Sequence, residues 1–134
     1  MRIRLAQFQG FIADEETFIR WYVHTFAPEH LPAFHQSFSE KDLSDMVRRG
    51  RNLAIKHGFL DPPSQVHFVT LMFKLGPTFF RFPGFQPITE ATSLPGPERI
   101  RRYYEDVTSD QATFAILSSE DRLWSPDLLG DDIL

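Results

Sequence analysis

The chain has 134 residues, 42% of them hydrophobic and 14% aromatic, with 14 phenylalanines and no cysteine. This length predicts one domain whose core needs no metal or disulfide, and the lack of cysteine excludes thiolate nucleophiles and cysteine-bound zinc. The formal net charge is −4 and the acidic excess falls within residues 120–134, so the neutral body argues against nonspecific binding to nucleic acid.

The first predicted helix runs from about residue 4 to residue 26, where apolar side chains recur at helical spacing. Gly10 weakens this helix by about 1 kcal/mol relative to alanine, so a break between Gly10 and Asp14 is left open. The pair Ala27-Pro28 is expected to end the helix, because a residue before proline disfavours the helical conformation. A short helical turn and connector is expected over residues 30–38.

A second long helix is predicted between Ser39 and Gly58. Ser39 and Asp42 have the spacing of a capping box, with Asp42 in place of the usual glutamate. Gly50 falls on the apolar face of this helix, so we interpret it as a point of close approach between helices. Gly58 suits the left-handed conformation that closes many helices.

The segment that organises the rest of the chain is the helix predicted over residues 61–76. Asp61 is a typical N-cap, and Pro62 follows at a position where a missing N–H costs nothing. Gly76 and Pro77 are expected to end the helix. Apolar side chains surround nearly all of it: Val66, Phe68, Val69, Leu71, Met72, Phe73 and Leu75. One narrow polar stripe is expected from His67, Thr70 and Lys74.

A helix that is apolar around most of its circumference has to be buried by its neighbours. We therefore predict an all-α fold, a single-domain small bundle of about five helices around the buried central helix 61–76. An aromatic connector, a short helix over residues 86–91 and a helix opened by Pro97 are expected to follow. Residues around Thr108 are expected to interrupt that helix and to start a last apolar turn.

The sequence carries no recognisable catalytic or cofactor-binding motif. Its five histidines lack the spacing of a zinc-binding helix, no serine lies in a nucleophile elbow, and no glycine-rich phosphate loop is present. We therefore expect a protein that is not an enzyme and binds no cofactor or metal. No apolar run approaches the roughly 20 residues that span a bilayer. The N-terminus has no apolar signal core, so we expect a cytoplasmic location.

Residues 1–119 form the predicted helical domain, and residues 120–134 form an acidic, hydrophobic C-terminal tail. Two basic clusters could receive an acidic partner segment or could be salt-bridged exposed faces; they comprise Arg48, Arg49 and Arg51, and Arg99, Arg101 and Arg102. The tail could fold back on its own body, or it could dock an apolar anchor in a partner's pocket. Its candidate anchors are Trp124, Leu128, Leu129, Ile133 and Leu134.

Residues 18–104 carry a combination of motifs that resembles a known bacterial family. The matching stretches are Thr25-Phe26-Ala27-Pro28, Ala-x-x-His-Gly over residues 54–58, Leu-Met-Phe-x-Leu-Gly-Pro-x-Phe over residues 71–79, Pro97, Arg99-Ile100 and Tyr103-Tyr104. The chain resembles small all-helical accessory proteins encoded beside spike and effector genes in type VI secretion clusters. It departs from that pattern at Phe80-Arg81, where relatives often carry an acid, and in the tail that contains Trp124.

The resemblance implies an accessory role in effector loading without catalysis, as a chaperone, co-chaperone or adaptor. The expected partner is a protein, namely an effector, a second chaperone or a spike protein, and a homo-oligomer is left open. An alternative is an immunity protein that binds and neutralises a cognate secreted toxin. In that case the acidic tail of this chain could occupy a basic active site of the toxin. Neither nucleic acid nor a membrane is expected as a partner.

Overall fold

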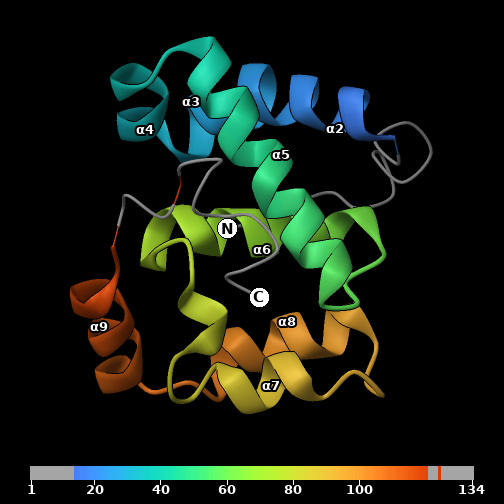
Figure 1. Cartoon of the computed structure of the whole chain (residues 1–134), viewed down its shortest axis with the longest axis vertical. Coiled ribbons are helices and arrows are strands. Elements are labelled where there is room, and N and C mark those ends of the chain that lie inside the picture. Colours follow the sequence, from blue (N-terminus) through green and yellow to red (C-terminus); the bar gives the residue numbers. More distant parts are fainter. Residues whose placement is uncertain (1–13, 121–123, 125–134) are drawn as a thin grey trace.

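The computed structural model of the chain describes residues 14–120 and Trp124, and Figure 1 shows this part of the molecule as helices joined by short loops. The predicted single-domain all-α bundle is confirmed. The start of the first predicted helix, residues 4–13, lies outside the described residues. In chain order the helical segments are α2 (Glu15–Trp21), the π-helix η1 (Tyr22–Phe26), α3 (Ala27–His30), α4 (Pro32–Ser37), α5 (Glu40–Lys56), α6 (Pro62–Leu75), the 3₁₀-helix η2 (Phe79–Arg81), α7 (Gln86–Glu90), α8 (Gly96–Glu105) and α9 (Ser109–Ser118).

The chain stays helical past Ala27-Pro28, so the prediction that this pair ends the first helix is wrong. α2 begins after Asp14, whose side chain accepts a hydrogen bond from the Thr17 N–H. The widened π-helical segment then changes the hydrogen-bond pattern, since the Ala27 N–H bonds to the Tyr22 carbonyl. Pro28 therefore falls in the first turn of α3, where its missing N–H costs nothing.

The predicted second helix is α5, and its N-cap is confirmed. The Ser39 hydroxyl accepts a hydrogen bond from the Asp42 N–H at 3.0 Å. Gly50 is buried where α5 crosses α6: a Cβ atom on Gly50 would lie 3.0 Å from Val69 Cγ2 and 3.2 Å from Met72 Sδ. Gly50 therefore allows the close approach of the two helices that its position on the apolar face predicted.

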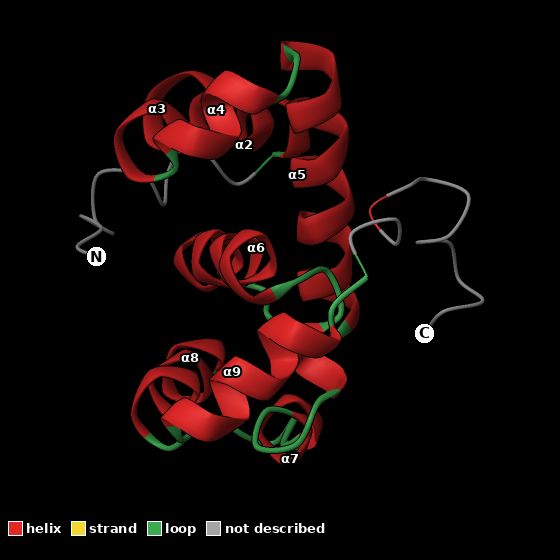
Figure 2. Cartoon of the chain, turned by 90° about the vertical axis from the view of Figure 1, so that its left-hand side faces the viewer, coloured by secondary structure: helices red, strands yellow, loops and turns green. Residues whose placement is uncertain are grey.

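The central helix α6 is enclosed between two layers of helices. Figure 2 shows it nearly end-on. We call the helices above it, α2, α3 and α4, the upper layer, and those below it, α7, α8 and α9, the lower layer. Its predicted ends are confirmed, because Asp61 accepts a hydrogen bond from the Ser64 N–H and Gly76 has φ of +118°. A positive φ of this kind favours glycine.

The polar stripe predicted on α6 is corrected at Thr70, which is fully buried. Its hydroxyl donates to the Val66 carbonyl at 2.7 Å, so the group is satisfied without water. His67 is half-buried and Lys74 is exposed. The water-exposed part of α6 is therefore narrower than the sequence pattern predicted.

Two hydrophobic clusters meet at α6. The upper cluster contains Phe18, Ile19, Tyr22, Val23, Phe26, Ala27, Leu31, Leu43, Met46, Val47, Val66, Val69 and Phe73. The lower cluster contains Leu53, Ala54, Phe59, Phe68, Leu71, Met72, Phe79, Phe80, Phe85, Ile88, Ile100, Tyr103 and Ala115. Because each fully buried large apolar side chain contributes about 1.5–3 kcal/mol, these clusters stabilise the fold. α6 supplies side chains to both.

The lower layer begins with η2 and α7, which form the predicted aromatic connector and short helix. Pro97 lies in the first turn of α8, as its sequence position predicts. Thr108 and Gln111 then form a complete capping box at the start of α9. The predicted interruption and restart near Thr108 is therefore confirmed. Among the described residues, no helix combines the length and hydrophobicity needed to cross a bilayer.

Candidate functional site

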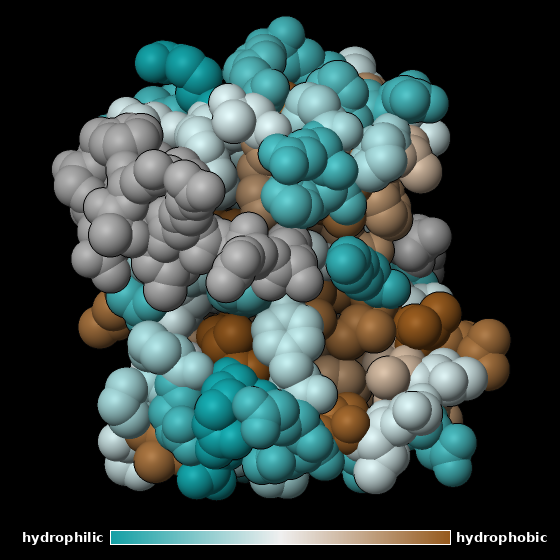
Figure 3. Space-filling model, turned by 180° about the vertical axis from the view of Figure 1, so that it is seen from behind, coloured by the Kyte–Doolittle hydropathy of each residue, from teal (hydrophilic) through white to brown (hydrophobic). Residues whose placement is uncertain are grey.

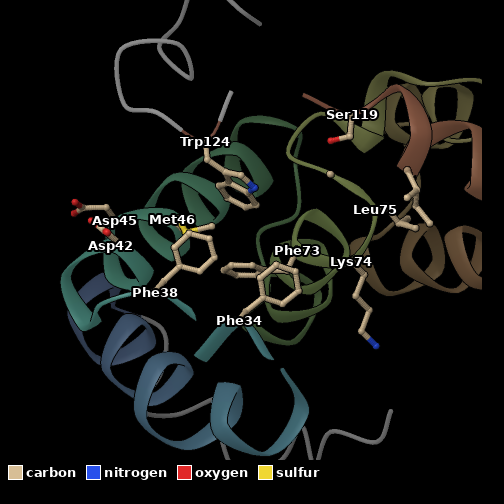
Figure 4. Close-up of a pocket in the computed structure, with 12 residues that line it drawn as sticks. Phe34, Phe38, Asp42, Asp45, Met46, Phe73, Lys74, Leu75, Ser119 and Trp124 are labelled. Atoms are coloured by element: carbon tan, nitrogen blue, oxygen red, sulfur yellow. The ribbon is translucent and has the colours of Figure 1, made fainter. Parts of the chain in front are cut away.

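Among the described residues, a hollow lined largely by apolar and aromatic side chains lies where α4, α5, α6 and α9 come together. It encloses about 480 Å³ and is lined by Phe34, Phe38, Asp42, Asp45, Met46, Phe73, Lys74, Leu75, Gly76, Ile116, Ser119 and Trp124. We call this hollow the aromatic groove. Figure 4 shows the rings of Phe34, Phe38, Phe73 and Trp124 gathered within it. Its volume lies within the range of pockets that bind small molecules.

The aromatic lining of the groove comes from two helices that the chain brings together. Phe34 on α4 and the following Phe38 stack with their centroids 6.4 Å apart. Phe34 also lies 5.2 Å from Phe73, near the end of α6. Phe38 is 40% exposed, so this wall opens to solvent. The groove therefore presents apolar rings that the two core clusters do not fully cover.

Trp124 from the C-terminal tail sits in this groove. Its ring stacks on that of Phe73, with 5.1 Å between the centroids and 28° between the planes. Trp124 packs against both hydrophobic clusters. At this residue the tail contacts its own body, one of the two alternatives that the sequence left open. The other predicted anchors lie outside the described residues: Leu128, Leu129, Ile133 and Leu134.

The apolar surface continues from the groove along α9. Phe114, Ile116 and Leu117 are 51%, 50% and 79% exposed, and Ile116 also lines the groove. Figure 3, seen from behind, shows hydrophobic atoms gathered toward the side on which α9 lies. The residues around Phe114 were predicted to form an apolar turn of the bundle, yet the side chain that α9 buries is that of Ala115. Much of α9 therefore presents apolar side chains to solvent.

Charged side chains stand at opposite edges of the groove, with Asp42 and Asp45 at one edge and Lys74 at the other (Figure 4). Asp45 is already paired, because its carboxylate lies 3.1 Å from Lys41 and 3.2 Å from Arg48. Asp42 and Lys74 are exposed, and neither has an ion-pair partner within residues 14–120. Counting only the part of the chain that the structure describes, the groove thus has an anion without an ion-pair partner at one edge, Asp42, and a cation without one at the other, Lys74.

Two arginines of the basic cluster of α5, Arg48 and Arg51, contact α2. Arg48 lies 3.7 Å from Glu15 and 3.5 Å from Glu16, in addition to its contact with Asp45. Arg51 lies over the ring of Phe18 at 5.6 Å. Arg49, the third member of the cluster, is half-buried. These contacts favour the interpretation of this cluster as a salt-bridged face.

Arg99 was predicted to lie on a partner-binding surface, and this prediction is wrong because Arg99 is 1% exposed. Its Nη1 donates to the His57 carbonyl at 2.9 Å and to the Thr89 carbonyl at 3.0 Å. Its guanidinium also lies 3.9 Å from the centre of the Phe59 ring. Arg99 therefore ties three segments of the lower layer together.

The neighbouring arginines of α8 are paired along their own helix. Arg101 contacts Glu98 and lies 3.0 Å from Glu105, and Arg102 lies 3.3 Å from Glu98. Hydrogen bonds from Arg101 and Arg102 lower the pKa of Glu98 to about 2. With Arg99 buried, only Arg101 and Arg102 of this cluster reach the surface, and both are paired with acids of their own helix.

One histidine outside the groove is strongly perturbed. His67 Nδ1 lies 2.8 Å from the Tyr104 hydroxyl, and burial lowers the pKa of His67 to about 4. The imidazole is therefore neutral near pH 7. Over residues 14–120 and Trp124, no group of three or more His, Cys, Asp or Glu side chains is arranged to hold a metal ion.

Sequence reasoning missed most of the groove. Phe73 was assigned to the buried helix, and Phe34 and Phe38 to a connector, so nothing indicated that they meet. The signal that could have found them is the density of aromatic residues in the short segment 34–38, which is too short to bury them by itself. Trp124 was the one groove residue identified as a candidate anchor.

The fold and the site together define a small all-α protein with an aromatic groove that its own tail enters. No protein-family model matches the chain, and neither a characterised protein nor a solved structure shows significant similarity to it.

Proposed function

We propose that this protein is a non-catalytic protein-binding module whose binding site is the aromatic groove. The observation that carries the proposal is the seating of Trp124 on Phe73 in a groove that still encloses about 480 Å³. Aromatic anchors in pockets supply much of the energy of many protein–protein contacts. A groove that accepts an indole from its own chain has the shape and chemistry to accept such an anchor from another protein.

The exposed apolar side chains of α9 support the same proposal. Phe114, Ile116 and Leu117 are exposed on this helix, and Ile116 also lines the groove. Contiguous exposed apolar surface on a small domain commonly marks a site of protein contact. Helix-in-groove recognition uses such a surface, since an amphipathic partner helix places its apolar face along it.

The biological role that we propose is effector loading in a type VI secretion system, as a cytoplasmic chaperone, co-chaperone or adaptor. This part of the proposal rests on the resemblance of residues 18–104 to the accessory proteins of those clusters. The residues of that resemblance include Phe73 and Gly76, which line the groove. The partner would be an effector, a second chaperone or a spike protein.

The test is co-purification with the products of the neighbouring genes, followed by a secretion assay. Loading predicts a stable complex with one neighbour and loss of effector secretion when the protein is deleted. Separate elution from every neighbour would contradict the proposal. Protection of growth against a co-expressed toxin, with secretion unaffected, would instead support the alternative of an immunity protein.

A further inference from the structure

The charges at the edges of the groove indicate which kind of segment binds there. We propose that the groove binds a protein segment with an aromatic anchor flanked on one side by a lysine or arginine, which faces Asp42, and on the other by an acid, which faces Lys74. Trp124 occupies the anchor position until such a segment displaces it. This inference rests on the proposed function, because it names the partner chemistry of the same groove.

The anchor is specified by what Trp124 already contacts. An indole stacked on Phe73 at 5.1 Å shows that a flat ring fits the floor of the groove. Phe34 and Met46 line the groove beside Phe73, so the anchor meets apolar atoms there. Aromatic pairs of this geometry contribute about 0.5–1.5 kcal/mol beyond their buried area. An aliphatic anchor would lose that contribution.

The flanking charges follow from the unpaired groups at the two edges. Asp45 already has Lys41 and Arg48 as partners, whereas Asp42 and Lys74 have no ion-pair partner in the part of the chain that the structure describes. A segment that carries a cation on one side of its anchor and an acid on the other can therefore pair with Asp42 and Lys74 at the same time. Complementary charges of this kind set the orientation and specificity of a docked segment more than its affinity.

The tail of this chain has the same order of residues. In the sequence Arg122 precedes Trp124 by two positions, and Asp127 follows it by three. A peptide of residues 119–130 is therefore a suitable probe for the groove. Because Trp124 is covalently attached, it competes as if present at millimolar concentration, and it reduces the apparent affinity of the intact chain for any added segment.

The experiment measures binding of this fluorescently labelled peptide to the full chain and to the full-length variant Trp124→Ala by anisotropy. We expect the variant to bind the peptide at least about tenfold more tightly, because its groove is vacant. Equal affinities, or no binding to a variant that circular dichroism shows to be folded, would overturn the inference.

A charge swap tests the flanking groups. In the Trp124→Ala background, Asp42→Lys should weaken peptide binding about three- to tenfold, and a peptide with Arg122→Glu should restore it. The matched control is Asp106→Lys, which makes the same charge change at an exposed site outside the groove and should leave binding unchanged. Equal effects of the two substitutions would overturn the assignment of Asp42.

A second measurement keeps the test independent of Trp124→Ala. The chain has two tryptophans, so Trp21→Phe leaves Trp124 as the only tryptophan, and excitation at a wavelength that tyrosine does not absorb reports on it alone. A millimolar excess of the peptide with phenylalanine in place of its tryptophan should then shift the emission to the red. An unchanged spectrum would contradict displacement.

Two further outcomes separate this inference from the proposed function. If the parent chain is a dimer that the peptide converts to a monomer, the occupant is a second copy, and the inference of a separate partner is overturned. If a neighbour's product co-purifies as strongly with Phe38→Glu as with the parent, effector loading stands and the groove assignment fails. Peptide binding without any neighbour complex would instead support the groove and reject the loading role.

Discussion

The hydroxyl groups of Tyr22 and Thr70 lie 2.7 Å apart in the buried contact between η1 and α6. Because the Thr70 hydroxyl already donates to the Val66 carbonyl, the Tyr22 hydroxyl is the donor of this pair. Burial raises the pKa of the Tyr22 phenol, so the group keeps its proton. This hydrogen bond is a directional link between the upper layer and the central helix.

Thr70→Val should destabilise the protein by about 1–3 kcal/mol, since it leaves the buried Tyr22 hydroxyl without an acceptor. Tyr22→Phe should cost less, because Thr70 keeps its bond to Val66. The double variant should be more stable than the sum of the two losses predicts. Urea unfolding of the parent and the three variants measures this, and strictly additive losses would contradict the pairing.

Gly50→Ala should lower the free energy of unfolding by about 1 kcal/mol or more, because overpacking outweighs the gain in helix propensity. The new methyl would lie 3.0 Å from Val69 Cγ2, within a closely packed helix crossing. Asn52→Ala, on the exposed side of α5, is the control and should be neutral or slightly stabilising. A stabilised Gly50→Ala variant in thermal unfolding would show that α5 and α6 separate more easily than their packing indicates.

Arg99→Met should destabilise the lower layer by about 2–4 kcal/mol, because two backbone carbonyls lose a charged donor. Arg102→Met, which removes a half-exposed pairing with Glu98, should cost less than about 1 kcal/mol. Denaturant titration of both variants gives the comparison. Similar losses for the two substitutions would mean that the buried contacts of Arg99 are worth no more than a surface pair.

The pKa of His67 predicts a stability that falls in acid. The folded protein holds this pKa near 4, below the unfolded value of 6.5, so only the unfolded chain gains a proton between these values. The contribution of neutral His67 to the free energy of unfolding is therefore complete above about pH 6.5. At most about 3 kcal/mol of this free energy is lost as the pH falls to 4. His67→Gln should flatten this dependence in thermal unfolding, whereas the control His35→Gln should keep it.

The fold could be predicted largely from α6, because Asp61 and Gly76 mark its ends and its apolar circumference demands burial. The continuation through Pro28 could not, since it depends on a π-helical turn that no residue preference indicates. The burial of Arg99 was also missed, because its partners are backbone carbonyls of His57 and Thr89, which carry no sequence signal. The groove depends on tertiary contacts between segments far apart in the chain, so only Trp124 could be singled out beforehand.

The shared use of α6 by both hydrophobic clusters has a consequence for how the molecule opens. Neither layer can come away without exposing one side of this helix, so its amide hydrogens should exchange with deuterium only through global unfolding. α9 buries only Ala115, and its amides should exchange much sooner through fraying. Release of α9 would widen the groove while the rest of the domain stays intact.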